Sequence, residues 1–243
     1  MVTKVFVATP MYGGMCTGTY ANSLMQVPGA LFNSGVELQY HYITNEALIT
    51  RGRNQLAYEF VNSDATHLMF IDGDIGFNPY DIISMLNCDK DIVCGVYPKK
   101  TINWPAIHTA VLNNYNPESL EAFSGEYVVN MVKDVAFKNN ELIEIEHGGT
   151  GFMLIKRGVI ENLITHVDNY INDGQNALDI ALDKKPELIP ELFFTQVCKD
   201  TKRLLSEDYA FCKLSKSWGF SIFAAPWVRL THTGSHVFNG ILN

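Results

Sequence analysis

Two carboxylates separated by one glycine, Asp72-Gly73-Asp74, follow an apolar stretch at residues 67–71 that is predicted to be a buried strand. Side chains two positions apart leave a strand on the same side, and the glycine between them lets a ligand approach the backbone. Such a pair suits a hard divalent cation that is shared with phosphate oxygens. Acidic pairs also occur in ordinary turns, where aspartate bonds to nearby backbone groups. The preceding strand favours the functional interpretation, because it presents both acids at the end of a sheet.

Two further polar motifs could act together with this acidic pair. Arg51-Gly52-Arg53-Asn54 lies at the predicted start of a helix, where free backbone amides and the helix dipole favour anions. The competing interpretation is a solvated arginine near a surface turn. Glu207-Asp208 begins a later predicted helix. Acidic residues there can stabilise the first turn through the helix dipole, or one of them can be a general base that deprotonates a hydroxyl group.

Histidines and glycines complete the set of candidate residues. His232-Thr233-Gly234-Ser235-His236 follows a predicted apolar strand at residues 227–230. A histidine there is either a hydrogen-bonded structural residue or a ligand of a transition metal such as manganese. Gly148-Gly149-Thr150-Gly151 lacks both the GxGxxG spacing and the Gly-Lys-Ser/Thr ending of phosphate loops, so on its own it predicts a tight turn.

The elements that must position these residues alternate in the first half of the chain. Apolar segments predict strands at 4–8, 36–43, 67–71 and 91–95, with helices at 18–33, 50–62 and 79–86 between them. Strands that alternate with helices imply crossover connections and a mostly parallel sheet. Ligands of such sheets bind beyond the carboxyl ends of the strands, where Thr9-Pro10-Met11-Tyr12 and the acidic pair both lie.

The second half of the chain has a different pattern. Residues 127–137 and 142–146 predict a hairpin that turns at Asn139-Asn140, followed by a strand at 152–155 and a helix at 207–218. Residues 173–190 predict a surface insertion or lid. We expect one α/β domain over residues 1–243, with a nucleotide-binding half at 1–100 and an acceptor-binding half at 101–243.

Composition limits the functional class. The 243 residues, 47% of them hydrophobic, suffice for one buried core, and the net charge of -8 argues against a nucleic-acid partner. The five cysteines are scattered without a CxxC pair, which indicates reduced thiols. No secretory signal is visible, and no apolar run approaches the ~20 residues of a membrane span. The sequence therefore predicts a cytoplasmic protein, in the host cytoplasm if the source is a virus.

In this order, the motifs resemble the glycosyltransferases of the GT-A fold, particularly the family-two-like enzymes of bacteria, phages and large DNA viruses. The resemblance runs from Val5 to about His236 and is most telling at 49–57, Ile-Thr-Arg-Gly-Arg-Asn-Gln-Leu-Ala, and at 65–75, Ala-Thr-His-Leu-Met-Phe-Ile-Asp-Gly-Asp-Ile. It is thinner at residues 99–147, where the acceptor would be selected. It implies a single GT-A domain with a mostly parallel central sheet, flanking helices and a small antiparallel portion.

The resemblance also implies roles for individual residues. Asp208 would be the catalytic base, next to Glu207, and the metal, Mn²⁺ or Mg²⁺, would be held by Asp74, His232 and Asp72. The donor would be a nucleotide-diphosphate sugar, preferably a UDP sugar, and the acceptor a glycan or another hydroxyl compound. The implied nucleotide-sugar site consists of Thr9, Pro10, Tyr12, Arg53, Asn54, Asp72, Gly73 and Gly149.

Three other functions are compatible with parts of this pattern. A retaining transferase would need a different arrangement on the other face of the sugar, and nothing in the sequence excludes it. A nucleotidyltransferase normally carries a lysine in a glycine-rich loop near the first strand, and residues 11–18 contain none. An inactive nucleotide-sugar or glycan-binding module would have lost its base or metal ligands, yet Asp72, Asp74, Asp208 and His232 are all present.

Overall fold

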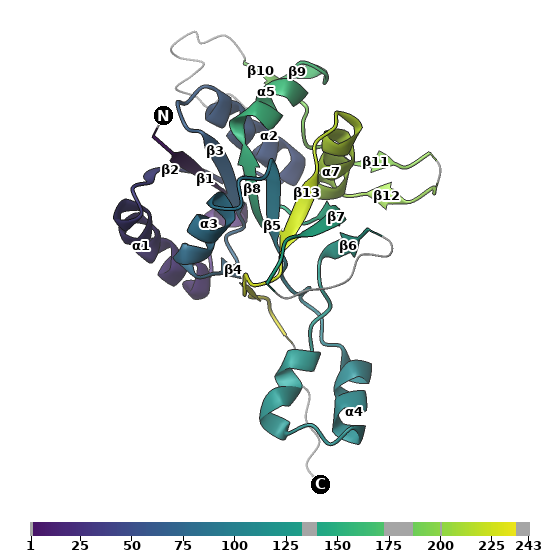
Figure 1. Cartoon of the computed structure of the whole chain (residues 1–243). Helices are drawn as coiled ribbons and strands as arrows, with labels where there is room; N and C mark the ends of the chain where they lie inside the picture. The colour runs from purple at the N-terminus through teal and green to yellow at the C-terminus, as the bar shows by residue number, and fades with distance from the viewer. Residues whose placement is uncertain (1, 133–139, 173–186, 200, 237–243) are drawn as a thin grey trace.

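A computed structural model describes residues 2–132, 140–172, 187–199 and 201–236 (Figure 1). Its centre is an eight-stranded sheet with the strand order β2-β1-β3-β8-β5-β13-β7-β6. Strands β8 and β7 run against the other six. The predicted α/β class, with a mostly parallel sheet and a small antiparallel portion, is confirmed. The strands are β1 (Lys4–Met11), β2 (Glu37–Thr44), β3 (His67–Ile71), β5 (Ile92–Gly95), β6 (Val129–Met131), β7 (Ile143–Gly148), β8 (Phe152–Lys156) and β13 (Ile222–Ala225).

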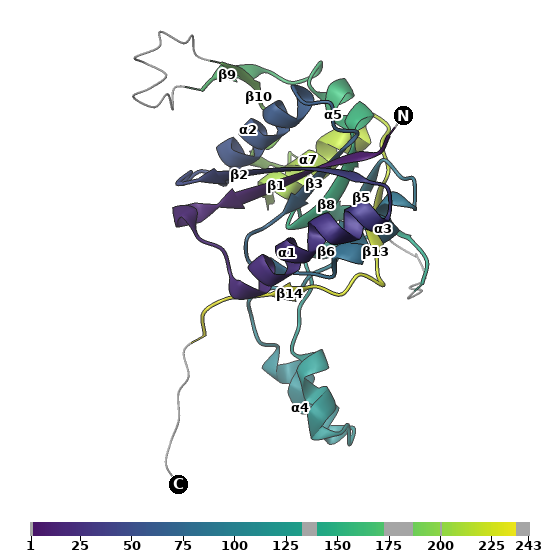
Figure 2. The same ribbon diagram turned by 90° about the vertical axis from the view of Figure 1, so that its left-hand side faces the viewer.

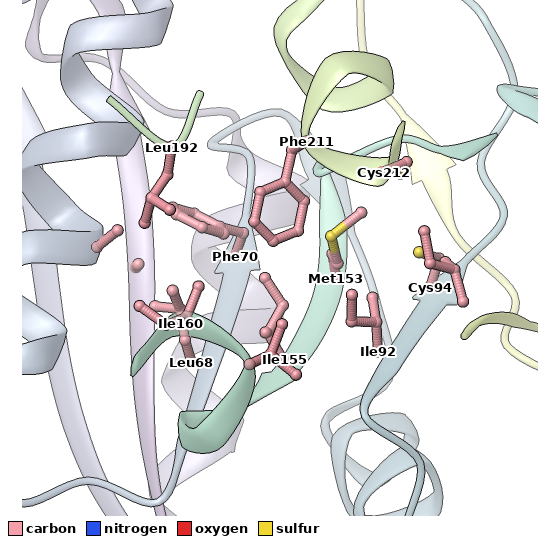
Figure 3. Close-up of a cluster of buried hydrophobic side chains, with 14 of the residues drawn as sticks. Leu68, Phe70, Ile92, Cys94, Met153, Ile155, Ile160, Leu192, Phe211 and Cys212 are labelled. Atoms are coloured by element: carbon pink, nitrogen blue, oxygen red, sulfur yellow. The ribbon is translucent and has the colours of Figure 1, made fainter. Parts of the chain in front are cut away.

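Side chains that alternate along the strands build one apolar core on each face of the sheet. In β1, Val5 and Val7 join one cluster, and Phe6 and Ala8 join the other. Each large apolar side chain that is fully buried contributes about 1.5–3 kcal/mol. Figure 3 shows part of the second cluster, where Leu68, Phe70 and Phe211 are among the labelled side chains. The sheet is therefore covered on both faces, as its apolar strands predict.

Helices cover the two faces in separate groups (Figure 2). The helices α1 (Gly18–Asn33) and α3 (Pro79–Leu86) pack on the face of Val5 and Val7. The opposite face carries α2 (Ile49–Val61), α5 (Arg157–Leu163) and α7 (Glu207–Ser217). The helices predicted at 18–33 and 79–86 have the predicted bounds. For the helices predicted at 50–62 and 207–218, both ends lie within one residue of the predicted positions.

In the described part of the chain, three two-stranded antiparallel sheets lie outside the central sheet. They pair β4 (Ile75–Gly76) with β14 (Thr231–His232), β9 (Asn169–Ile171) with β10 (Leu188–Pro190), and β11 (Gln196–Val197) with β12 (Leu204–Leu205). The first of these pairs joins the segment after the acidic motif to a segment near the C-terminus. It therefore positions candidate residues that are far apart in the sequence.

A helical protrusion connects β5 to β6 and stands away from the sheet (Figures 1 and 2). It consists of α4 (Trp104–Leu112) and the 3-10 helix η2 (Pro117–Phe123). Asn103 caps α4, because its side chain accepts a hydrogen bond from the Ala106 amide. Two backbone hydrogen bonds hold the base of the protrusion, from Lys99 to Glu126 at 2.6 Å and from Val128 to Tyr97 at 3.1 Å.

Two expectations for the second half need correction. The strand expected at 227–230 is wrong, because β13 lies at Ile222–Ala225, where it pairs with β5 and β7. Pro226, which has no amide hydrogen, follows this strand directly. The end of the expected insertion at 173–190 is strand β10, and residues 173–186 lie outside the described residues.

The expected hairpin is present as the antiparallel pair β6 and β7, with residues 133–139 outside the described part. Among the described residues, no helix is both long enough and apolar enough to cross a membrane.

Candidate functional site

A cavity of about 610 Å³ lies beyond the carboxyl ends of β1 and β3. We call it the strand-end cavity. This volume lies within the range of small-molecule sites. The amide of Thr17 donates to the Gly73 carbonyl at 2.8 Å, which fixes the loop after the 3-10 helix η1 (Tyr12–Gly14) against the acidic motif. The lining includes Pro10, Met11, Tyr12, Cys16, Ile43, Glu46, Gly52, Asp72, Gly73 and Asp74.

Arg53 connects two of the predicted acidic residues. It lies in the first turns of α2 and is only 3% exposed. Its Nη2 donates to both carboxylate oxygens of Asp72, at 3.0 and 3.3 Å, and its Nε donates to Glu207 at 3.3 Å. Burial alone would lower the pKa of Arg53, but the charges of Asp72 and Glu207 raise it, so the guanidinium stays protonated. The structure thus joins three residues from separate segments into one ionic cluster.

Two buried side-chain atoms of this region, Nη1 of Arg53 and Oγ1 of Thr150, have no hydrogen-bond partner within the described part of the chain. Thr150 precedes Gly151, whose carbonyl accepts from the Asp72 amide at 3.0 Å. Buried donors and acceptors are nearly always paired, so these two atoms indicate a bound water or ligand group.

His232 lies beside Asp74 because β14 pairs with β4. The Thr233 amide donates to the Asp74 carbonyl at 2.9 Å, and the Nε2 atom of His232 lies 3.4 Å from Oδ1 of Asp74. A side chain at Gly76 would collide with the Thr231 hydroxyl, so this pairing requires glycine there. The tertiary structure therefore brings together two of the three predicted metal ligands, Asp74 and His232.

Lys100 also contacts Asp74, and its Nζ donates to Oδ2. Burial alone would raise the pKa of Asp74, but the interactions with His232 and Lys100 lower it below its ordinary value. Asp74 is therefore ionised at neutral pH. Nothing in the sequence indicates this contact, because Lys100 lies at the start of the least regular region of the chain.

The residues around Asp74 fit a divalent cation in part. Nδ1 of His232 lies 2.8 Å from the Pro98 carbonyl, which can only accept, so Nδ1 carries the hydrogen and Nε2 faces Asp74. Such support from a carbonyl is typical of metal-binding histidines. Asp72, the third predicted ligand, accepts hydrogen bonds from Arg53 through both its oxygens.

Two coordinating side chains would be enough for a metal ion only if a bound small molecule supplied the remaining coordinating atoms. Within the described residues, no group of three or more His, Cys, Asp or Glu side chains could hold a metal ion. Mg²⁺ is commonly bound by one or two carboxylates together with substrate phosphates. Asp74 and His232 therefore suit a cation that arrives with a phosphate ligand, and Lys100 would have to release Asp74.

Asp208, the predicted base, is partly buried in the first turn of α7. Burial raises the pKa of its carboxyl group, and the charge of Glu207 adds to the rise, against hydrogen bonds that lower it. Those hydrogen bonds come from the Ser206 hydroxyl and, at 2.8 Å, from the Tyr209 amide. A carboxylate with a raised pKa accepts a proton more readily near neutral pH. Glu207 is instead engaged with Arg53.

Two predicted nucleotide-binding residues make structural contacts. Thr9 is fully buried and its hydroxyl lies 2.6 Å from that of Tyr20, on the core side of β1. Asn54 is 2% exposed and exchanges two hydrogen bonds, of 3.0 and 2.7 Å, with the backbone of Phe193. Neither side chain lines the strand-end cavity, whereas Pro10, Tyr12 and Gly73 do.

Gly149 lies against Tyr97 and is not open to a ligand at its Cα. A Cβ atom at position 149 would collide with the Tyr97 hydroxyl, and one at Gly151 would lie 2.7 Å from the tyrosine ring. The Gly151 amide donates to that hydroxyl at 3.1 Å. The Tyr97 ring also packs edge-on against His232, with 5.3 Å between centroids. Tyr97 thus contacts both the glycine segment at 149–151 and His232. Its position in the sequence does not reveal this role.

No protein-family model matches the chain, and no curated protein matches its sequence. Among solved structures, A197 from STIV is similar with a TM-score of 0.50 and 16% identity, over 96% of this chain and 86% of A197. This likeness concerns the fold alone.

Two weaker structural similarities are to glycosyltransferases. GalNAc-T7, solved with UDP, GalNAc and Mn²⁺, gives a TM-score of 0.42 and 9% identity, over 95% of this chain and 44% of its own. A glycosyltransferase involved in the glycosylation of the major capsid of PBCV-1 gives 0.32 and 10%, over 65% of this chain and 62% of its own.

Proposed function

We propose that the protein is a glycosyltransferase that uses a divalent cation and a nucleotide-diphosphate sugar, preferably a UDP sugar, to glycosylate a hydroxyl acceptor with inversion. The observation that carries this proposal is the convergence of three separate segments on the acidic motif, whose Asp72 and Asp74 line the strand-end cavity. Arg53 contacts Asp72 and links it to Glu207, which precedes Asp208, and His232 lies beside Asp74. Separate surface roles for these residues would not require them to meet.

In this proposal the nucleotide occupies the strand-end cavity. Pro10 and the exposed ring of Tyr12 would contact the base, and Gly73 would let the backbone approach the donor. The diphosphate would lie at Asp74. A bound Mn²⁺ or Mg²⁺ would supply positive charge to the departing diphosphate, with Asp74 and His232 as its protein ligands.

The transfer needs one base. The acceptor oxygen forms a bond to the anomeric carbon while the bond from that carbon to the diphosphate oxygen breaks, and the acceptor proton moves to Asp208. The diphosphate leaves with the bonding electrons. The raised pKa of Asp208 supports this role, and the pair between Arg53 and Glu207 holds the first turn of α7 beside the acidic motif.

A binding experiment tests the donor site. Thermal unfolding is measured with nucleotide diphosphates and their sugars, with and without Mn²⁺, because a ligand that binds only the native state stabilises it by about 2.7 kcal/mol at 100 times its Kd. We expect a metal-dependent rise in Tm for one nucleotide sugar. Asp74→Ala should lose this rise. Asp89→Ala, which removes a carboxylate whose side chain is 88% exposed, should retain it. No response across the panel would refute the donor site.

Activity and product analysis separate the alternatives. Donor binding without any transfer or hydrolysis would identify an inactive binding module. The anomeric configuration of a product would distinguish inversion from retention, since retention cannot use Asp208 as the single base described above.

A further inference from the structure

A second cavity, of about 590 Å³, lies at the base of the helical protrusion. We call it the protrusion cavity. Lys100 and His232 line it, and both contact Asp74, which lines the strand-end cavity. The two cavities therefore share one wall, formed by the side chains proposed to meet the donor diphosphate. A molecule in the protrusion cavity would lie next to the reacting end of the donor.

The walls of this cavity combine aromatic rings with hydroxyl groups. Trp104, at the start of α4, is 64% exposed, and Tyr127, in the opposite arm of the protrusion, is 53% exposed. Large exposed aromatic side chains are typical of binding surfaces, because one ring offers apolar area and a polar edge. Hydroxyl groups are contributed by Thr101, Ser124, Thr231 and Ser235.

Both lysines in the lining form ion pairs. Lys100 pairs with Asp74, and Lys99 pairs with Glu126 at 3.4 Å. Residues 101–117 contain no Asp, Glu, Lys or Arg. Glu121 lines the cavity as an exposed carboxylate, which can accept hydrogen bonds from hydroxyl groups. Within the described residues and without a bound cation, both lysines of this lining are held by carboxylates, an arrangement that does not favour a phosphate or a nucleic-acid backbone.

From these features we propose that the protrusion cavity binds the acceptor, and that the acceptor is an uncharged saccharide whose ring packs on Trp104. The inference depends on the proposed function for its catalytic meaning, but the binding itself can be measured separately. A saccharide fits both components of the wall, since its C–H face is apolar and its hydroxyl groups donate to carboxylate and hydroxyl oxygens. It also presents the hydroxyl group that the transfer requires.

The indole N–H signals of the three tryptophans provide a site-specific measurement. Trp104 lines the cavity, whereas Trp227 donates to Ser84 at 3.0 Å and Trp218 stacks on His166 with 3.4 Å between centroids. A proton–nitrogen NMR titration of the full chain with glucose, galactose, mannose and N-acetylglucosamine should move the Trp104 signal, assigned with Trp104→Phe. The other two signals serve as internal controls. Glucuronate should bind no more tightly than glucose.

Variants test whether the aromatic wall is the cause. Trp104→Ala should weaken saccharide binding about tenfold, the scale of an aromatic contact residue, while metal-dependent donor binding is unchanged. Tyr127→Ala should also weaken saccharide binding. Tyr115→Ala is the matched control, because this half-exposed tyrosine lies on the same protrusion but outside the cavity. It should have no effect.

The outcomes distinguish this inference from the proposed function. Donor binding without any saccharide-induced shift of Trp104 would overturn the acceptor assignment and leave the donor site standing. Tighter binding of glucuronate than of glucose would also overturn it, in favour of an anionic acceptor. A shift of Trp104 in a protein that binds no nucleotide sugar would support a saccharide site and refute the transferase.

Discussion

Replacing Arg53 with methionine should cost the protein a large part of its stability. The guanidinium is the shared partner of Asp72 and Glu207, and its side chain is only 4% exposed. Methionine keeps much of the side-chain volume and its contact with Phe70, over whose ring the guanidinium now lies at 5.4 Å. The main change is therefore the loss of a positive charge from between two carboxylates.

The size of the effect follows from burial. Removing one partner of a buried ion pair costs about 3–5 kcal/mol, because the remaining charge is left without compensation. Asp72 and Glu207 retain 26% and 14% of their side-chain exposure, so water can partly replace the arginine. We therefore expect a loss of about 3 kcal/mol. With a urea m-value of about 3 kcal/mol/M, this lowers the unfolding midpoint by roughly 1 M.

Urea unfolding of three variants tests this reasoning. Arg51→Met is the matched control, because Arg51 lies in the same helix and pairs with Glu46, which precedes the helix. The Arg51 side chain is 38% exposed, so water can replace its pair more readily, and we expect a loss of about 1 kcal/mol. Adding Asp72→Asn to Arg53→Met should recover part of the loss, since it removes one of the uncompensated charges. If Arg53→Met unfolded at the same urea concentration as Arg51→Met, the ionic cluster would not have the role that we assign to it.

Three further predictions concern the site. Asp208→Asn should reduce transfer by about 100- to 10,000-fold in a steady-state assay, and should unfold at a higher temperature than wild type at pH 7.5. The reason is that burial raises the folded-state pKa of Asp208, so wild type loses stability as the pH rises through that pKa. The difference in unfolding temperature between variant and wild type should disappear below about pH 3.9, the ordinary pKa of aspartate. Lys100→Met should lower the Mn²⁺ concentration needed for donor-induced stabilisation by up to about fivefold, since the half-exposed lysine competes with the metal for Asp74. An unchanged Mn²⁺ dependence would contradict that competition. Gly149→Ala should lower stability by about 1–3 kcal/mol in urea unfolding, with partial recovery by Tyr97→Phe, which removes the hydroxyl that the new methyl group meets; additive effects would argue against this clash.

The sequence determined the local elements and the chemical character of the site. The apolar stretch at 67–71 predicts β3, and the acidic motif directly after it is placed at the carboxyl end of that strand. The helices predicted at 18–33 and 79–86 are present as α1 and α3. These predictions succeed because the periodicity of apolar side chains depends only on backbone geometry over a few residues.

Tertiary structure alone decided which of these residues meet. The insertion of β8 between β3 and β5, antiparallel to both, is not encoded in any local pattern. The same is true of the pairing of β4 with β14, which places His232 beside Asp74, and of the protrusion that delivers Lys100 to the same carboxylate. Strand order and register depend on the fit of whole elements against both cores, and the free energy of that fit is spread over many distant side chains. A sequence therefore shows which groups can do chemistry, while the packing of the sheet decides their partners, their charge state and their distances.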